Sequence, residues 1–488
     1  MTIECFDSGR WSGKLYLGGW TAAAGGILAV TEPATGRELA QVGRATVGDV
    51  AVAVARAAAA QPAWAALSHR DKTKLLLRAA DSLESRAEEL AIAIVRETGA
   101  IRPKGDLEIR ETVALFRHAA AMLAEPQGIL LPTTRAGRMS YAKREPHGVV
   151  GVISPFNFPL VLGARAVAPA LAAGNTVVLK PDPRTPLTGG IMLARAIEEA
   201  GFPDGVFHML PGGAEVGQAL VEHPATRLIA FTGSTVAGRA IGEICGRLLK
   251  RTSLELGGKS PLIILEDADL DVAASNAAFG AFLHQGQICM ASGRILVQER
   301  IAADFTARLA AKASHLPVGN PATENVALGP LISESQLRRV HAIVEETVAQ
   351  GARLEAGGTH EGLFYRPTVL SGVKKGMRSY GDEVFGPVAS VITFGGDDEA
   401  VEIANDTEYG LSAAVISPSV GRALAIGERI HSGLLHINDQ TVADEVANPF
   451  GGRGASGNGG NIGGPANWDL FTQWRWITVS DTPSPKPY

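Results

Sequence analysis

Short, continuous apolar runs alternate with longer amphipathic segments through the middle of the chain. The apolar runs lie at 149–153, 176–179, 206–210, 228–231 and 253–256. The segments between them have apolar residues at helical spacing and lie at 160–173, 187–200, 214–222 and 235–249. Continuous apolar strands have both faces covered, and strands that alternate with helices form parallel βαβ units. The pattern predicts a doubly wound α/β domain.

A second α/β series follows the first. Its apolar runs lie at 261–265, 294–297, 413–416 and 433–438, and its helical patterns at 269–284, 302–314, 333–350 and 420–430. Before the first series, residues 46–125 show helical periodicity, including one helix predicted at 75–98. The periodicity therefore predicts two α/β domains with further helices packed on them.

Two segments outside these series predict a projecting arm. Residues 128–145 are short, polar and alternating, which is typical of an exposed ribbon with a free edge. Residues 468–479 are aromatic and β-branched and read as a strand too apolar for a free chain end. We expect the two segments to pair within a subunit interface and to make the protein a homodimer or homotetramer. The Gly-rich stretch 451–464 must be a loop.

Composition narrows the classes of function. With 488 residues the chain has room for two or three domains. A net charge of −5 without a sizeable basic run argues against a nucleic-acid partner, and no apolar run reaches the roughly 18 residues that span a membrane. The cysteines Cys5, Cys245 and Cys289 are few and irregularly spaced. This spacing favours a reducing, cytoplasmic location without disulfides and predicts no metal site.

Cys289 is the candidate nucleophile. It lies between Ile288 and Met290, at the junction between a helical pattern and a strand-like one. A thiol at such a boundary can face a cleft, and its thiolate can attack a carbonyl. The alternative is an inert thiol in the core, because free cysteine is among the most buried residue types.

Glu255 and Asn157 are candidates to act with a nucleophile. Glu255 lies among leucines at a strand end, which should raise its pKa toward that of a general base working near neutral pH. Asn157 lies in a loop fixed by Pro155 and Pro159, and a rigid amide can stabilise an oxyanion. The alternatives are a paired structural glutamate and an asparagine that hydrogen-bonds its own turn.

Two further strand ends suit a phosphate-bearing ligand. Lys180 ends one strand and could reach a phosphate or ribose, although an isolated lysine is more often a solvated surface residue. Residues 231–234 end another strand and open a helix, whose first N–H groups could bind a pyrophosphate. In a doubly wound sheet, ligands bind at strand ends such as these.

Six segments, taken together, resemble the NAD(P)-dependent aldehyde dehydrogenase superfamily over essentially the whole chain. They are 155–159 (PFNFP), 231–234 (FTGS), 254–261 (LELGGKSP), 286–289 (GQIC), 383–387 (EVFGP) and 449–452 (PFGG). The resemblance implies an NAD(P)-binding domain at 1–126 and 147–256 and a catalytic domain at 257–448. It also implies an oligomerisation β-arm at 127–146 and 466–488, with the Gly-rich loop at 449–465 between them.

The resemblance also implies residue roles. Cys289 is expected to be the nucleophile, Glu255 the base that activates water, and Asn157 the oxyanion donor together with the Cys289 backbone N–H. Lys180 and Glu383 are expected to bind cofactor ribose, Phe385 to lie beside the nicotinamide, and Gly233 and Ser234 to form the pyrophosphate turn. The other expected cofactor-binding residues are Ile153, Ser154, Pro155, Phe156, Asp182, Arg184, Gly217, Phe231, Leu256 and Gly257. The presence of Glu255 favours release of a free acid over transfer to coenzyme A.

One position departs from the pattern of NAD-selective members. These usually carry a glutamate three residues after the lysine that matches Lys180, where it binds both ribose hydroxyls. Here that position is Pro183, followed by Arg184. Without the carboxylate a 2′-phosphate is not repelled, and Arg184 could pair with it. We expect either NAD or NADP to serve as cofactor, with NADP accepted or preferred.

The segment 282–290 is similar to the benzaldehyde and vanillin dehydrogenase branch. An apolar collar would suit a flat ring and would consist of Phe158, Leu162, Ile288, Met290 and Phe450, although these residues are equally plausible as core. Two alternatives stay open. One is an aliphatic or semialdehyde dehydrogenase, and the other is a non-redox hydrolase or acyltransferase that uses Cys289 with a histidine such as His284.

Overall fold

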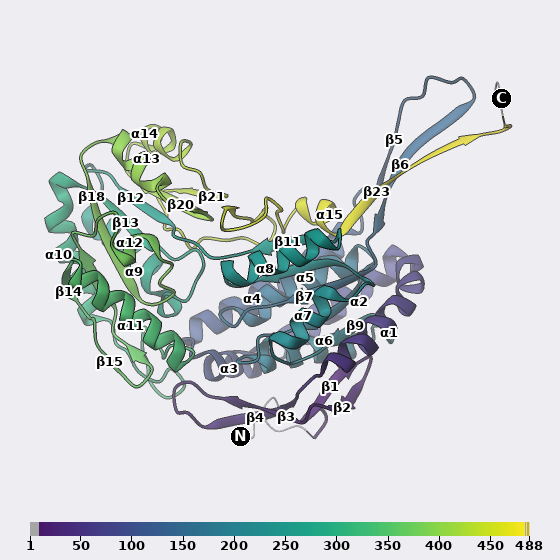
Figure 1. Cartoon of the computed structure of the whole chain (residues 1–488), viewed down its shortest axis with the longest axis horizontal. Helices are drawn as coiled ribbons and strands as arrows, with labels where there is room; N and C mark the ends of the chain where they lie inside the picture. The colour runs from purple at the N-terminus through teal and green to yellow at the C-terminus, as the bar shows by residue number, and fades with distance from the viewer. Residues whose placement is uncertain (1–8, 484, 486–487) are drawn as a thin grey trace.

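The computed structural model describes residues 9–483, 485 and 488, so Cys5 lies outside the described residues. Two seven-stranded sheets form the body, and a three-stranded sheet projects from it as an arm (Figure 1). This architecture confirms the predicted fold class of a doubly wound domain, a second α/β domain and a β-arm.

The first sheet has the strand order β11-β10-β7-β8-β9-β1-β2. Its strands are β7 (Val149–Ile153), β8 (Thr176–Lys180), β9 (Phe207–Met209), β10 (Thr226–Thr232), β11 (Arg251–Glu255), β1 (Lys14–Leu17) and β2 (Trp20–Ala22). The strands from β7 to β11 are parallel, and they run outward from β7 in both directions. Strand order therefore reverses between β7 and β10, and the loops after these two strands flank a crevice where such sheets bind ligands.

Helices cover this sheet and extend the domain. The crossovers are α5 (Pro159–Ala172), a π-helical turn (Leu187–Ile191) with α6 (Met192–Ala200), α7 (Ala214–Glu222) and α8 (Thr235–Arg247). The N-terminal helices are α1 (Val47–Ala66), α2 (His69–Ser85), α3 (Ala87–Thr98) and α4 (Arg102–Met122), of which α4 packs on α5. The single helix predicted at 75–98 was wrong, because the chain breaks at Arg86 with φ −114° and ψ 20°.

The second sheet has the strand order β14-β17-β18-β13-β12-β20-β21. Its strands are β14 (Arg353–Ala356), β17 (Thr368–Ser371), β18 (Val388–Phe394), β13 (Arg294–Gln298), β12 (Pro261–Ile264), β20 (Ser412–Ile416) and β21 (Leu434–Ile437). Its helices are α9 (Leu270–Phe282), α10 (Glu299–His315), α11 (Glu334–Ala349), α12 (Arg378–Gly381), α13 (Asp397–Asn405) and α14 (Val420–Gly427). The remaining short strands are β3 (Ile27–Thr31), β4 (Glu38–Gly43), β15 (His360–Glu361), β16 (Phe364–Tyr365), β19 (Tyr409–Gly410) and β22 (Arg453–Gly454).

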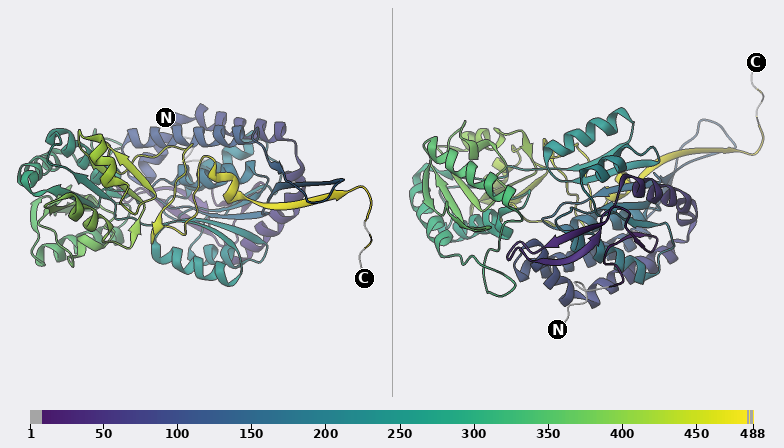
Figure 2. Two further views of the ribbon diagram at one scale, coloured as in Figure 1. Left: turned by 90° about the horizontal axis from the view of Figure 1, so that it is seen from above. Right: turned by 60° about the horizontal axis from the view of Figure 1, so that its bottom comes forward.

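The predicted pairing of ribbon and tail is present. Strand β23 (Thr472–Ser480) runs antiparallel to β6 (Arg138–Pro146), which also pairs with β5 (Gly128–Leu130), and together they leave the body as one arm (Figure 2). The strand predicted from residue 468 begins later, because residues up to Phe471 form the short helix α15 (Ala466–Phe471). The apolar side chains of this helix are buried, so their composition reflects packing rather than a strand.

Among the described residues, no single helix is long and apolar enough to cross a membrane. Helices α1 and α2 would meet that requirement only when joined, and they are bent by 118° relative to each other.

Candidate active site

Cys289 lies in the turn that links α9 to β13. After α9 the chain forms a 3-10 turn (Leu283–Gly286) in which His284 and Gln285 have φ of 48° and 57°. Few non-glycine residues adopt this left-handed conformation, which begins at His284, five residues before the cysteine, just after α9 ends at Phe282. The Cys289 side chain is partly buried and lines a cavity, so the sulfur is not simply part of the core.

The cavity brings the predicted nucleophile and the predicted base together. It is lined from α5, from β7, β10 and β11, and from the Gly-rich loop. Its lining residues are Val152, Ile153, Leu162, Arg165, Ala166, Ala230, Phe231, Thr232, Ser253, Glu255, Leu256, Cys289, Phe450 and Ile462. Cys289 and Glu255, which are far apart in the sequence, therefore face one space.

Glu255 is a buried carboxyl group at the end of β11. Neither of its oxygens has a hydrogen-bond partner of ordinary geometry among the described residues. Burial raises the pKa of Glu255 well above the usual value, and the negative charge of Asp444 raises it further. The positive charge of Arg165 lowers this pKa, and the Gly452 backbone N–H lowers it by a smaller amount. Burial therefore favours the protonated acid more than it would for an exposed glutamate, and only the ionised carboxylate can accept a proton.

Asn157 is held against the cysteine loop. Its side chain is 4% exposed, and its Nδ2 donates a hydrogen bond of 2.9 Å to the backbone oxygen of Gln287. An amide nitrogen carries two hydrogens, so one remains available to another acceptor. The loop thus places an amide donor next to the segment that carries Cys289.

The environment of Cys289 favours the protonated thiol. Burial, with further contributions from Glu383, Glu255 and Asp444, raises its pKa to about 12. Only a very small fraction is thiolate at neutral pH in this state.

Arg165 and Asp444 are site residues that the sequence reading missed. Arg165 on α5 is 5% exposed, forms an ion pair with Asp444, and has its guanidinium carbon 4.9 Å from the Phe450 ring centre. Its Nε and Nη1 atoms have no hydrogen-bond partner among the described residues. An arginine within an otherwise buried helical segment was the available signal, since buried arginines need partners.

The expected cofactor residues converge at the switch point of the first sheet. A Cβ placed on Gly217 would lie 3.7 Å from Ile153 Cδ1 and 3.9 Å from Lys180 Cδ, so these three residues share one surface. The Ser154 Oγ atom in the loop after β7 is buried and has no hydrogen-bond partner among the described residues. An orphaned hydroxyl beside a lysine at strand ends fits a ribose or phosphate group.

On the opposite side of the crevice, Ser234 caps α8 and its Oγ accepts from the Ala237 N–H. Gly233 lies directly against the Phe231 ring, because a Cβ there would approach Phe231 Cζ to 2.5 Å. Leu256 packs on the same helix at Gly238, where a Cβ would come within 2.3 Å of it. Ser234 and Val236 are exposed, so the first turn of α8 is open to solvent at the place where an anion would bind.

Glu383 reaches into the site from the second domain. Its Oε1 accepts a hydrogen bond of 3.0 Å from the Gly258 N–H, and a side chain on Gly257 would collide with its carboxylate. Phe385, with φ of 54°, stands edge-on to Phe156 with ring centres 5.8 Å apart. Pro155 and Phe156 are thus in the loop that faces this segment.

Arg184 is already engaged by its neighbour. Its Nε and Nη2 donate to the two oxygens of Asp182 at 2.8 and 2.7 Å, and its guanidinium carbon lies 4.1 Å from the Phe156 ring centre. The planar group is therefore oriented, but a 2′-phosphate would have to share it with Asp182.

The expected collar is only partly assembled. Leu162 and Phe450 line the cavity with Cys289, whereas Phe158, Ile288 and Met290 are not among its lining residues. Ile288 and Met290 are 4% and 7% exposed and belong to the core of the first domain. Phe450 is also 4% exposed and belongs to the same core, so burial does not separate collar residues from core residues here.

His284 does not support the alternative of a Cys/His hydrolase. It is fully buried, neither ring nitrogen has a hydrogen-bond partner of ordinary geometry among the described residues, and its ring stands edge-on to Phe158. Burial lowers the pKa of His284 well below the usual value, and the charge of Lys104 lowers it further.

Among the described residues there is no group of three or more His, Cys, Asp or Glu side chains placed to hold a metal ion.

Comparison with known proteins agrees with this geometry. A model of the aldehyde dehydrogenase family matches residues 20–477. The chain is 53% identical to vanillin dehydrogenase of an Amycolatopsis species and 47% identical to benzaldehyde dehydrogenase [NAD(+)] of Pseudomonas putida, each over 98% of both chains. It superposes with a TM-score of 0.94 on a salicylaldehyde dehydrogenase from Pseudomonas putida G7 complexed with salicylaldehyde, at 36% identity over 97% of this chain and 99% of the other. The chain belongs to the aldehyde dehydrogenase family, whose members oxidise aldehydes with NAD(P).

Proposed function

We propose that this enzyme oxidises an aromatic aldehyde to the carboxylic acid. The observation that carries the proposal is that Cys289 and Glu255 line one cavity, while Asn157 is bonded to the segment two residues before the cysteine. Relatives named for vanillin, benzaldehyde and salicylaldehyde support an aromatic substrate. An aliphatic or semialdehyde substrate is not favoured.

Cys289 is the nucleophile in this proposal. Its sulfur, as the thiolate, adds to the aldehyde carbon, and the free Asn157 N–H with the Cys289 backbone N–H stabilises the resulting oxyanion. When bound, the nicotinamide cofactor supplies the hydride acceptor. The product on the enzyme is a thioester at Cys289.

Glu255 completes the turnover. In its ionised form it takes a proton from water, the water oxygen adds to the thioester carbon, and the Cys289 sulfur leaves. Because burial raises the pKa of the carboxyl group, this step should accelerate as pH rises through that raised pKa and the ionised form becomes more abundant. A free acid, rather than an ester of coenzyme A, is the product.

The cavity also has a polar feature that favours an oxygen-bearing ring. The unpartnered Nε and Nη1 of Arg165 can donate to a hydroxyl or methoxy oxygen, and Asp444 can accept from a hydroxyl. Small-molecule sites combine apolar walls with a few fixed polar groups of this kind.

We propose that the enzyme accepts NADP as well as NAD. The support is the Pro183–Arg184 sequence and the oriented Arg184 guanidinium. Lys180 and Glu383 would bind ribose, and Gly233 and Ser234 would hold the pyrophosphate.

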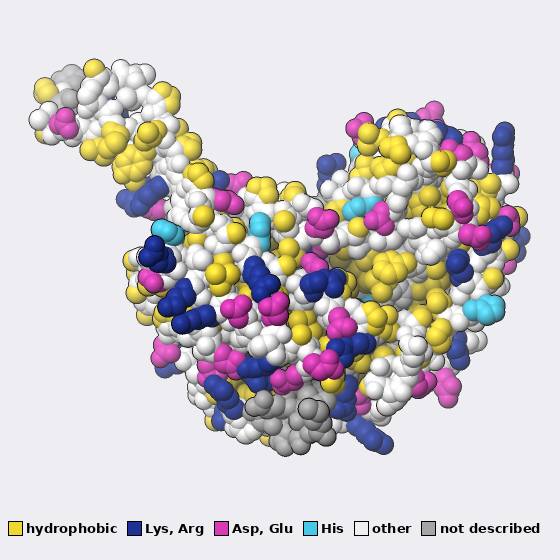
Figure 3. All heavy atoms as spheres, turned by 180° about the vertical axis from the view of Figure 1, so that it is seen from behind, with side chains coloured by type: hydrophobic (Ala, Val, Ile, Leu, Met, Phe, Trp, Pro, Cys, Tyr) yellow, Lys and Arg dark blue, Asp and Glu magenta, His cyan; other side chains and the backbone are white. Residues whose placement is uncertain are grey.

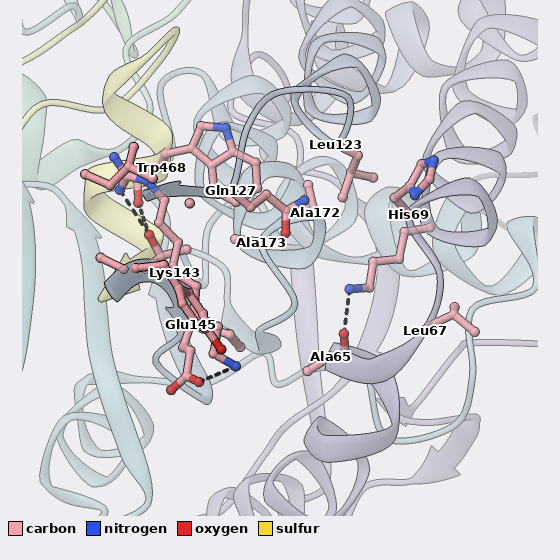
Figure 4. A pocket seen from close by; sticks show the side chains of 18 of the residues that line it. Ala65, Leu67, His69, Leu123, Gln127, Lys143, Glu145, Ala172, Ala173 and Trp468 are labelled. Atoms are coloured by element: carbon pink, nitrogen blue, oxygen red, sulfur yellow. Dashed lines mark hydrogen bonds and ion pairs between the residues drawn. The ribbon is translucent and has the colours of Figure 1, made fainter. Parts of the chain in front are cut away.

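A homodimer or homotetramer built through the arm is also proposed. Hydrophobic side chains gather on the arm (Figure 3), where Leu130 is 82% and Trp476 67% exposed. At the base of the arm lies an open cavity whose lining includes Trp468, Lys143, Glu145 and His69 (Figure 4). Exposed apolar side chains such as those on the arm mark an interface.

A cytoplasmic location is also proposed, because Cys245 and Cys289 are free thiols.

An aldehyde panel tests the proposed function. Benzaldehyde, hydroxylated and methoxylated benzaldehydes, and aliphatic aldehydes are compared by the absorbance of NADH and NADPH formed. Higher kcat/KM for the aromatic members supports the proposal. Preference for aliphatic aldehydes would contradict the substrate class, and ester hydrolysis without NAD(P) would contradict the reaction.

A further inference from the structure

A fully buried ion pair on α4 lies next to the site. Lys104 and Glu108 are one helical turn apart, both side chains are inaccessible, and Lys104 Nζ bonds to Glu108 Oε2. Buried charges are costly, and a buried pair of this kind is often no more stabilising than apolar residues of the same size. Fold stability alone therefore does not explain why this ion pair is buried here.

Glu108 takes the place of a helix cap. Helix α5 begins directly after the Asn157 loop and has no side-chain cap hydrogen bond of its own. Instead, Glu108 Oε1 accepts from the backbone N–H of Leu160 at 2.7 Å and of Val161 at 3.2 Å. A carboxylate is favoured at a helix N-terminus, where N–H groups lack partners. One side chain on α4 thus fixes the chain three residues after Asn157.

Lys104 connects the same helix to the cysteine loop. Its Nζ lies 4.3 Å from the centre of the Phe158 ring. That ring in turn stands edge-on to His284, with ring centres 5.6 Å apart, in the strained turn before Cys289. The pair therefore contacts the segment after Asn157 and, through Phe158, the segment before Cys289.

We propose that the Lys104–Glu108 pair is a positioning element that sets the Asn157 amide against the Cys289 loop. This inference rests on the oxyanion role proposed above for Asn157. Glu108 anchors the N-terminus of α5, and Lys104 neutralises the carboxylate while it contacts Phe158. The hydrogen bond from Asn157 to Gln287 then holds the Asn157 loop and the Cys289 loop at a fixed distance from each other. Oxyanion stabilisation depends steeply on donor placement, so a small displacement of α5 slows the acylation step.

The test is the first burst of NADH or NADPH from the full-length enzyme with benzaldehyde. Glu108→Gln keeps the shape but removes the charge that holds both N–H groups, and we expect the burst rate constant to fall about ten- to hundredfold. Alkylation of Cys289 by iodoacetamide needs no oxyanion donor and should keep its rate. The KM for the cofactor should also be unchanged. If Glu108→Gln does not fold, the burst rate constant is measured in Glu108→Asp, whose shorter side chain moves the carboxylate away from the two N–H groups.

Glu97→Gln is the matched control. Glu97 is also fully buried and accepts from two helix-start N–H groups, those of Leu187 and Thr188, each at 2.8 Å. That turn leads to α6 and touches α5 only by packing on Pro159, without capping it, so we expect lower thermal stability with a burst rate much closer to wild type than that of Glu108→Gln. This control separates general destabilisation from misplacement of the amide.

A double-mutant cycle identifies the residue through which the pair acts. In an Asn157→Ala background the further change Glu108→Gln should have no additional effect on the burst. An equal effect with and without Asn157, or an unchanged burst in Glu108→Gln, would overturn the inference while leaving the proposed function intact. Absence of NADH and NADPH formation by the wild-type enzyme with every aldehyde would overturn both.

Discussion

The Asn157 side chain donates a 2.9 Å hydrogen bond to the backbone carbonyl of Gln287, two residues before Cys289. This bond fixes the distance between the loop after β7 and the loop after α9, and it leaves one amide hydrogen for an oxyanion. Asn157→Ala should lower kcat about a hundredfold or more, the usual loss when one oxyanion donor is removed. Steady-state kinetics with benzaldehyde measures this. A loss confined to KM would instead assign Asn157 to substrate binding.

The pKa of the Cys289 thiol predicts how its reactivity depends on pH. Because the pKa is about 12, the thiolate fraction should rise about tenfold for each pH unit across the range from about pH 7 to 10. The rate of alkylation by iodoacetamide, followed on the Cys289 peptide by mass spectrometry, should rise in proportion. A plateau near neutral pH would contradict this account.

Substitution of Glu383 tests why the pKa of Cys289 is raised. After burial it contributes most to the raised pKa of Cys289, so Glu383→Gln should lower that pKa and speed alkylation at a fixed pH. Glu402→Gln, an exposed change on α13, is the control and should leave the alkylation rate as it was.

Arg165 should discriminate among ring substituents. Arg165→Met removes the donors while keeping a long side chain, and the ratio of kcat/KM for hydroxybenzaldehydes to that for benzaldehyde should fall about tenfold. All three positional isomers are measured, since any one of them can present its oxygen to the guanidinium. Arg195→Met, a buried arginine on α6, is the control for loss of a buried charge. An equal fall for substrates with and without the oxygen would make Arg165 a general electrostatic partner of Glu255.

Arg184 should govern the choice of cofactor. Arg184→Ala removes a guanidinium that Asp182 orients, so kcat/KM with NADP should fall about tenfold relative to NAD. Arg338→Ala, an exposed arginine on α11, should change neither value. A strict NAD requirement in the wild-type enzyme would refute the reading of Pro183 and Arg184.

The fold was predictable because its signals are local and periodic. Continuous apolar runs such as 149–153 and 176–179 became buried parallel strands of the first sheet. The pairing of the ribbon with the tail followed from two exposed segments that each needed a partner. The helix break at Arg86 and the helical start of the tail were missed, because tertiary packing rather than periodicity decides them.

The site was predictable only as a set of motifs. Cys289, Glu255 and Asn157 were chosen by residue type and place, and their convergence depends on a topology that periodicity cannot specify. Asp444 and Arg165 were missed because their significance arises from a contact between an irregular loop and α5. Ile288 and Met290 illustrate the reverse case, in which neighbours of the cysteine in sequence pack into the core.

The central claim is that one sulfur holds the acyl group and one carboxylate removes it. Glu255→Gln mixed with benzaldehyde and NADP, quenched in acid and digested, tests this directly by mass spectrometry. The account predicts one burst of NADPH per active site and a benzoyl group on the peptide that contains Cys289. A burst without that adduct, or hydride transfer slowed as much as acid release, would contradict the roles of Cys289 and Glu255.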